Sequence, residues 1–314
     1  MRPLSSIEGH TLIVPGLVSA HSHAFQHALR GKTQRATRDT GTFWSWREAM
    51  YQLADSLTPE SIERVSRRAF EELRATGVVA VGEFHYVHHQ PGGAPYDDRT
   101  ALADAVIRAA LAADLRITLL RVAYHGASPG QAPEGAQRRF SDPSPDLVLR
   151  DVDTLVARWK HEPRVRVGLA PHSVRAVPAA WIKELHGYAR SHAMPFHMHV
   201  AEVQGEVDTS LGHYGRRPVE LLADLGVLDA RFVAVHAVCL EAHEARLLGE
   251  ARAFVCVCPT TERDLGDGMA DLAALRDAGA RLCVGIDSHV VTDPVEEMRA
   301  LEMHERLRLR RRVT

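Results

Sequence analysis

The chain has 314 residues, and its 38 basic and 40 acidic side chains leave a formal net charge of −2. This balance argues against a nucleic-acid binder held by phosphate neutralisation and against a polybasic membrane-surface protein. A hydrophobic content of 45% and a charged content of 25% are typical of a globular protein, and the length suits one α/β barrel.

Apolar, β-branched segments alternate along the chain with helical patterns, which predicts repeated β-α units and a parallel sheet. In chain order the predicted strands are residues 11–20, 78–84, 116–123, 165–170, 195–200, 232–237, 253–258 and 281–286. The predicted helices are residues 59–75, 100–113, 151–160, 178–191, 218–225, 241–249, 271–278 and 294–309, and Thr58 is a plausible N-cap of the first. Residues 128–145 are rich in Pro, Gly and Ser and are predicted to form a loop. Eight such pairs in order predict a (β/α)₈ barrel.

No segment predicts export or a membrane anchor. No apolar run reaches the roughly 18 residues of a membrane-spanning helix, and the first residues lack the apolar core of a signal peptide. The four cysteines lie in apolar surroundings and do not suggest a disulfide framework. We therefore expect a cytoplasmic protein that binds neither nucleic acid nor membrane.

The first predicted strand ends in a pair of histidines, His21 and His23. Residues two apart on a strand point the same way, so the two imidazoles face one point, as a shared metal ion requires. Two polar loop histidines would explain this motif equally well.

Three further predicted strands carry metal-type ligands near their C-terminal ends. Taken singly, His236 is more often a satisfied core histidine than a functional residue. Active sites of such barrels lie at the rim formed by these strand ends, and four strands with ligands at one rim are rarely a coincidence. The candidates are His199 and Glu202 after the fifth strand, His236 on the sixth and Asp287 after the eighth.

The combined pattern resembles the amidohydrolase superfamily, and the His-x-x-Glu spacing of His199 and Glu202 resembles its mononuclear deaminase branch. Local segments are similar to the N-formimino-L-glutamate deiminase family of histidine degradation. They are residues 15–26, 43–48, 83–89, 170–177, 265–268 and 287–290. The resemblance implies a (β/α)₈ barrel with a small β-sandwich built from flanking residues. Both flanks look missing here, so residues 1–314 are expected to form a single catalytic domain. The resemblance also suggests a homodimer.

The resemblance implies a metal site formed by His21, His23, His199 and Asp287. Three nitrogens and one oxygen suit Zn²⁺ with one open position, and they also suit Fe²⁺ or Mn²⁺. A bound divalent ion can lower the pKa of water to about 7. We expect Asp287 to take the water proton.

Two more residues receive catalytic roles from the resemblance. His236 would hydrogen-bond the attacking hydroxide and the tetrahedral intermediate. Glu202 would hold the substrate amidinium and pass a proton to the departing ammonia. The alternative for Glu202 is a solvated loop carboxylate.

A substrate with two carboxylates and a formimino group requires cationic and hydrogen-bonding partners. Arg175 can bind a carboxylate bidentately, which Lys does not match in geometry. The resemblance implies that His172, Tyr86 and Gln26 also contact the substrate. For Arg175 an ordinary surface salt bridge remains the alternative.

Several features leave other readings open. Phe43, Trp44 and Trp46 form either a lid over the site or the packing of a long loop. Residues 260–264 are more charged than expected of the family. The expected reaction is hydrolytic deimination of N-formimino-L-glutamate. The alternatives are deamination of a purine or pyrimidine base and a barrel that binds a ligand without turnover.

Overall fold

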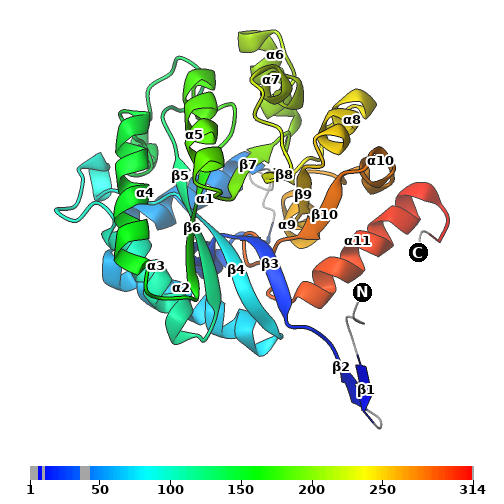
Figure 1. The fold of residues 1–314 in the computed structure, drawn as a ribbon, viewed down its shortest axis with the longest axis horizontal. Coiled ribbons are helices and arrows are strands. Elements are labelled where there is room, and N and C mark those ends of the chain that lie inside the picture. The colour runs from blue at the N-terminus through cyan, green and yellow to red at the C-terminus, as the bar shows by residue number, and fades with distance from the viewer. Residues whose placement is uncertain (1–5, 9–10, 36–42, 313–314) are drawn as a thin grey trace.

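A computed structural model describes residues 6–8, 11–35 and 43–312 of the chain. Eight parallel strands lie in one sheet, in chain order from β3 to β10 (Figure 1). A parallel bridge between Ser22 and Asp287 brings the two edge strands together, which confirms the predicted barrel and leaves it nearly closed. The strands are β3 Leu17–Ser22, β4 Val78–His85, β5 Arg116–Ala123, β6 Val165–Pro171, β7 Phe196–Val200, β8 Phe232–His236, β9 Phe254–Val257 and β10 Arg281–Val284.

Helices surround the sheet and alternate with its strands (Figure 1). They are α1 Phe43–Ser56, α2 Pro59–Ala75, α3 Ala101–Ala112, α4 Pro145–Trp159, α5 Ala179–Ser191, α6 Gln204–Tyr214, α7 Pro218–Asp224, α8 Ala242–Glu250, α9 Pro259–Leu265, α10 Leu272–Ala278 and α11 Pro294–Leu309. Short 3₁₀ turns cover Ala24–Leu29, Pro91–Gly93 and Gly135–Arg139. Within the described part of the chain, no helix has both the length and the apolar character to cross a membrane.

The start of α2 shows how local sequence sets an element. The Thr58 side chain accepts a hydrogen bond from the Ser61 backbone N–H, and the Ser61 hydroxyl accepts one from Thr58 in return. Pro59 occupies the first turn, where a missing N–H costs nothing. The buried residues Ile62, Phe70 and Leu73 lie on one face, so the helix packs on the sheet at its predicted bounds.

The predicted first strand, residues 11–20, is wrong in its first half. Thr11–Ile13 forms β2, which pairs antiparallel with β1 (Ser6–Glu8) in a hairpin that projects from the barrel (Figure 1). Pro15 has no N–H to donate to a ladder. At Gly16 a Cβ atom would lie 2.4 Å from a methyl carbon of Val79. These two residues therefore separate the hairpin from β3.

The other differences concern helices. The helix predicted at 151–160 begins earlier, at Pro145 after the N-cap Ser144, because proline suits the first helical turn. A 3₁₀ turn interrupts the predicted loop 128–145. Helices α1, α6 and α9 were not predicted. Two of them, α6 and α9, start within a few residues of the ends of β7 and β9, where the site lies.

Candidate metal centre and active site

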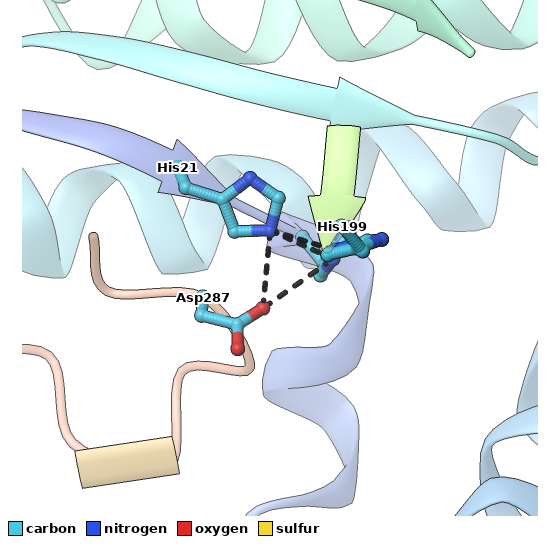
Figure 2. A group of neighbouring side chains, drawn as sticks. His21, His199 and Asp287 are labelled. Carbon is cyan, nitrogen blue, oxygen red and sulfur yellow. Dashed lines mark hydrogen bonds and ion pairs between the residues drawn. The ribbon is translucent and has the colours of Figure 1, made fainter. Parts of the chain in front are cut away.

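The structure brings the four predicted metal ligands together at the C-terminal rim of the barrel. His21 is on β3, His23 directly follows it, His199 is on β7 and Asp287 lies in the turn after β10. All four side chains are buried. Figure 2 shows His21, His199 and Asp287 turning the tips of their side chains toward one another. Their ligand atoms and that of His23 form one group within 4.8 Å.

The separations within this group fit a tetrahedral ion. The Nε2 atom of His21 lies 3.1 Å from Nε2 of His23 and 3.1 Å from Nε2 of His199. Asp287 Oδ1 lies 3.4 Å from Nε2 of His21 and 3.3 Å from Nε2 of His23. Zinc bonds of about 2.0–2.1 Å in a tetrahedron place the ligand atoms about 3.3–3.4 Å apart.

The charge state of the group also fits a cation. Burial lowers the pKa of all three imidazoles, that of His23 to about 3 with the help of His21, so neutral rings prevail near pH 7. Burial alone would raise the pKa of Asp287, but its hydrogen bond and charge interaction with His21 outweigh burial and hold the pKa well below the usual range. His23 Nδ1 donates to the Phe84 carbonyl at 2.9 Å, which leaves its Nε2 lone pair free. Three neutral imidazoles and one carboxylate can therefore hold a divalent ion.

His236 and Glu202 lie beside this group. His236 ends β8, and its Nε2 atom is 3.6 Å from Glu202 Oε1 and 3.8 Å from Asp287 Oδ2. Burial would lower the pKa of His236, but the surrounding carboxylates of Glu202, Glu262 and Asp287 raise it to about 10. Burial raises the pKa of Glu202. An imidazolium and a carboxyl group able to carry a proton thus face the same space as the candidate ligands.

The backbone at this rim is strained. His236 has φ 71° and Asp287 has φ 55°, both in the left-handed region that non-glycine residues seldom adopt. Such conformations cost about 1–3 kcal/mol each and persist only where surrounding contacts hold them. Both strained residues, His236 and Asp287, line the pocket with an imidazole and a carboxylate.

The predicted substrate contacts line the pocket above the metal group. Gln26, Tyr86, His172 and Arg175 all line it, together with Glu202 and every candidate ligand except His21. Gln26 Nε2 donates to Tyr86 Oη at 2.8 Å, and its Oε1 is buried without a partner. The pocket wall therefore keeps unsatisfied hydrogen-bonding capacity for a ligand.

Arg175 does not form the surface salt bridge that was its alternative. Its guanidinium donates to the Ala127 carbonyl at 2.6 Å, and within residues 6–8, 11–35 and 43–312 it makes no ion pair. Burial would lower its pKa, but Tyr124 and other neighbours raise it, so it stays charged. A charged guanidinium thus borders the pocket with donors to spare.

One pocket residue was missed, Arg47. It lies on the unpredicted helix α1, lines the pocket, and places its guanidinium 4.3 Å from the ring centre of Trp44. The available signal is that Arg47 belongs to residues 43–48, one of the segments that resemble the deiminase family. Phe43 and Trp46 also line the pocket. A second missed residue is Glu262 on α9, which accepts a hydrogen bond from His236 Nδ1 at 3.2 Å.

Comparisons with known proteins show which families and structures the chain is similar to. The family described as the amidohydrolase family matches residues 12–313. Formimidoylglutamate deiminase of Pseudomonas aeruginosa is 38% identical over 302 residues, which are 96% of this chain and 66% of that protein. The 8-oxoguanine deaminase of the same organism is 28% identical over 90% of this chain and 61% of its own length. The crystal structure of an amidohydrolase from Brucella melitensis has a TM-score of 0.90 and 36% identity, covering 95% of this chain and 66% of that one. The chain thus spans slightly less than two thirds of each of these relatives.

Proposed function

Because the chain belongs to the amidohydrolase family, we propose that it hydrolyses N-formimino-L-glutamate to N-formyl-L-glutamate and ammonia with one divalent metal ion. Zn²⁺ suits the ligand set best, and Fe²⁺ or Mn²⁺ suit it less specifically. The observation that carries the proposal is one pocket with three of the four candidate ligands, His23, His199 and Asp287, at its floor and two guanidinium groups in its wall. The 38% identity to formimidoylglutamate deiminase supports the same substrate.

The metal site would be held by His21, His23, His199 and Asp287. A divalent ion there supplies a nucleophile near neutral pH by lowering the pKa of water. Asp287 accepts the proton of the attacking water, because this residue lines the pocket and its Oδ2 atom lies 3.8 Å from His236 Nε2. His236 donates from Nε2 to the oxygen that ends in the formyl group.

Glu202 completes the proton transfers. Its carboxylate binds the positively charged formimino nitrogen and then gives a proton to that nitrogen, which leaves as ammonia when the C–N bond breaks. Burial supports this role because it raises the pKa of Glu202 and lets the group carry a proton at neutral pH. This is the first proton that the water loses, and it reaches Glu202 through Asp287 and His236, which lies 3.6 Å from Glu202. The second water proton passes from the new hydroxyl group to Asp287 as the C–N bond breaks and the formyl oxygen forms.

The two substrate carboxylates require fixed positive charge. Arg175, in the segment after β6, and Arg47, on helix α1, both supply positive charge to the pocket. Gln26, Tyr86 and His172 add neutral donors, and burial holds the pKa of His172 well below its usual range. A planar guanidinium binds a carboxylate through two parallel hydrogen bonds, which selects such substrates over neutral ones.

A nucleobase substrate is the second candidate. The relation to an 8-oxoguanine deaminase and the aromatic wall residues Trp46, Tyr86 and Phe140 favour it. The two guanidinium groups favour the dicarboxylate instead, since a neutral base leaves both charges unpaired. A barrel that binds a ligand without turnover is the third reading, and the intact ligand group argues against it.

The test is ammonia release by the purified, metal-loaded protein with N-formimino-L-glutamate, guanine, 8-oxoguanine and cytosine in parallel. We expect release from the first compound, about one metal ion per chain, and loss of activity on chelation. Folded, metal-loaded protein that releases ammonia only from a base would replace the proposal by the nucleobase reading. No release from any compound would favour the binding barrel.

A further inference from the structure

We propose that Glu262 is a positioning residue that fixes the ring orientation and the Nδ1 proton of His236, and this inference rests on the proposed function only for its catalytic consequence. Glu262 belongs to residues 260–264, whose charge was unexpected from the resemblance. Its side chain is 3% exposed, although it carries a carboxyl group. A buried carboxyl group requires partners, and one of them is His236.

One oxygen of the Glu262 carboxyl group accepts two hydrogen bonds. Oε1 accepts from His236 Nδ1 at 3.2 Å and from the Cys258 backbone N–H at 2.8 Å. Cys258 is the N-cap residue of α9, so the first turn of this helix fixes where the oxygen sits. The imidazole therefore meets an acceptor that cannot follow it if the ring turns.

The first turn of α9 is itself anchored to two other elements. The backbone N–H of Thr260 donates to Glu297 Oε2 of α11 at 3.0 Å. The Thr261 hydroxyl lies 2.9 Å from the hydroxyl of Ser288, the residue that follows Asp287. Helix α9 thus connects α11, the turn after β10 and the end of β8 in one rigid platform.

The platform meets His236 at the end of β8, where the backbone is strained. His236 leaves β8 with φ 71°, and no regular helix or strand follows it directly. A hydrogen bond at Nδ1 fixes which ring nitrogen carries the proton and which way the ring faces. With Nδ1 turned to Glu262, Nε2 faces Glu202 at 3.6 Å and Asp287 at 3.8 Å, the two groups between which it acts.

Two variants of Glu262 separate the effect of its hydrogen-bond acceptor from the effect of its charge. Glu262→Gln keeps the acceptor and the size, and Glu262→Met keeps the length but removes the acceptor. We expect kcat to fall in the order wild type, Glu262→Gln, Glu262→Met, with a loss of about 10–100-fold in the last. KM and metal content should stay unchanged, because Glu262 touches neither the proposed carboxylate partners nor the ligand group. Equal kcat in all three proteins would overturn the proposal, and so would a loss of metal that parallels the loss of rate.

A second measurement requires no turnover. In ¹⁵N-histidine-labelled protein, the His236 Nδ1 proton is assigned by its disappearance in His236→Asn. We expect a slowly exchanging resonance in wild type, a shifted one in Glu262→Gln because the acceptor has lost its charge, and none in Glu262→Met. If Glu262→Met does not fold, an unshifted resonance in Glu262→Gln overturns the proposal by itself. Should N-formimino-L-glutamate give no ammonia, the proposed function fails, and this resonance still decides whether Glu262 holds the ring.

The chain offers a matched control near the other end of β8. Asp229 lies just before β8, and its Oδ2 atom is 3.1 Å from Nε2 of His186, which makes a second, partly buried histidine–carboxylate pair. Asp229→Asn disturbs that pair at the far end of the strand. We expect unchanged kcat and an unchanged His236 resonance. A fall in kcat equal to that of Glu262→Gln would mean that general loosening of β8 causes the effect, and the proposal would be wrong.

Discussion

Two buried clusters of polar side chains differ in what completes them. On β5, Arg121 donates to Asp142 at 2.6 Å and to Asp151 at 2.7 Å, and Arg99 donates to Asp151 at 2.9 Å. At the barrel rim, the Nε2 atoms of the three candidate ligand histidines converge on each other at 3.1 Å beside a carboxylate. In the first cluster donors point at acceptors, whereas in the second acceptors point at acceptors.

The difference indicates which cluster serves structure and which serves chemistry. A buried charge that has an opposite charge in contact needs nothing more, and the arginine cluster is complete in this sense. Converging lone pairs that have left water require a cation to balance them. Burial alone does not mark a functional site, because Arg121, Asp142 and Asp151 are buried just as the four rim residues are.

The largest expected effect breaks the rim cluster. In His199→Ala we expect loss of the metal and a fall in kcat/KM of about 1,000-fold or more. A bound cation contributes several kcal/mol to the transition state, and about 1.4 kcal/mol is worth tenfold. Elemental analysis, ammonia release and circular dichroism measure the three consequences. The fold should persist, because the substitution removes a neutral imidazole and Asp287 keeps its contacts with His21 and His23. Normal metal content in this variant would contradict the proposed ligand set.

The arginine cluster should respond in the opposite way. Arg121→Met removes the buried partner that Asp142 and Asp151 share and leaves them only the partly exposed Arg99, so we expect a loss of about 3–5 kcal/mol in the free energy of unfolding. Urea unfolding measures it. Metal content per folded chain should not change. The double variant Arg121→Met/Asp142→Asn should recover part of the stability, and a further loss instead would show that the carboxylate charge is not the cause.

Much of the fold could be predicted because its signals are local. Helices α2 and α11 match their predicted bounds, and Thr58 is the N-cap of α2 as predicted. Strand β5 matches as well, since its apolar run is bounded by polar residues. The continuous apolar character of residues 11–20 concealed the break at Pro15. Helices α6 and α9 were not predicted because each is a short segment directly after a polar strand end, with too few residues to show a clear apolar period. Helix α1 was not predicted either.

The candidate site divides in the same manner. The convergence of His21 and His23 follows from strand geometry, and the barrel rim then brings His199 and Asp287 to them. Arg47 and Glu262 depend on how a helix folds across the mouth of the barrel, and no spacing in the sequence encodes that. Contacts between elements, rather than within them, set the limit of prediction here.

A smaller effect is expected in the pocket wall. The guanidinium of Arg175 has no ion-pair partner among the described residues, unlike Arg121, and it is not one of the converging ligand groups. Arg175→Ala should lower kcat/KM for N-formimino-L-glutamate about 10–100-fold, mainly through KM, because a charge-assisted hydrogen bond contributes about 1.5–3 kcal/mol. Steady-state kinetics measure it. Arg175→Lys should recover only part, since an ammonium lacks the paired donors. Unchanged kinetics in Arg175→Ala would remove its role with the carboxylate.

The smallest expected effect tests whether burial or neighbours depress the imidazole pKa values. His85 lies beside the arginine cluster, and burial together with the charge of Arg121 lowers its pKa from 6.5 to about 3, the value that His23 reaches at the rim. The folded protein therefore binds one proton fewer than the unfolded chain between these pH values. The stability due to neutral His85 is complete above pH 6.5 and is lost as the pH falls toward 3, by about 1.4 kcal/mol per pH unit.

His85→Gln removes this titrating group, so the free energy of unfolding of the variant should fall less steeply in urea titrations from pH 6.5 to 4.5. His23→Gln in the metal-free protein should flatten the slope equally if burial dominates in both clusters. A much smaller change for His85→Gln would show that its imidazole is protonated in the folded protein, despite burial and the nearby arginine.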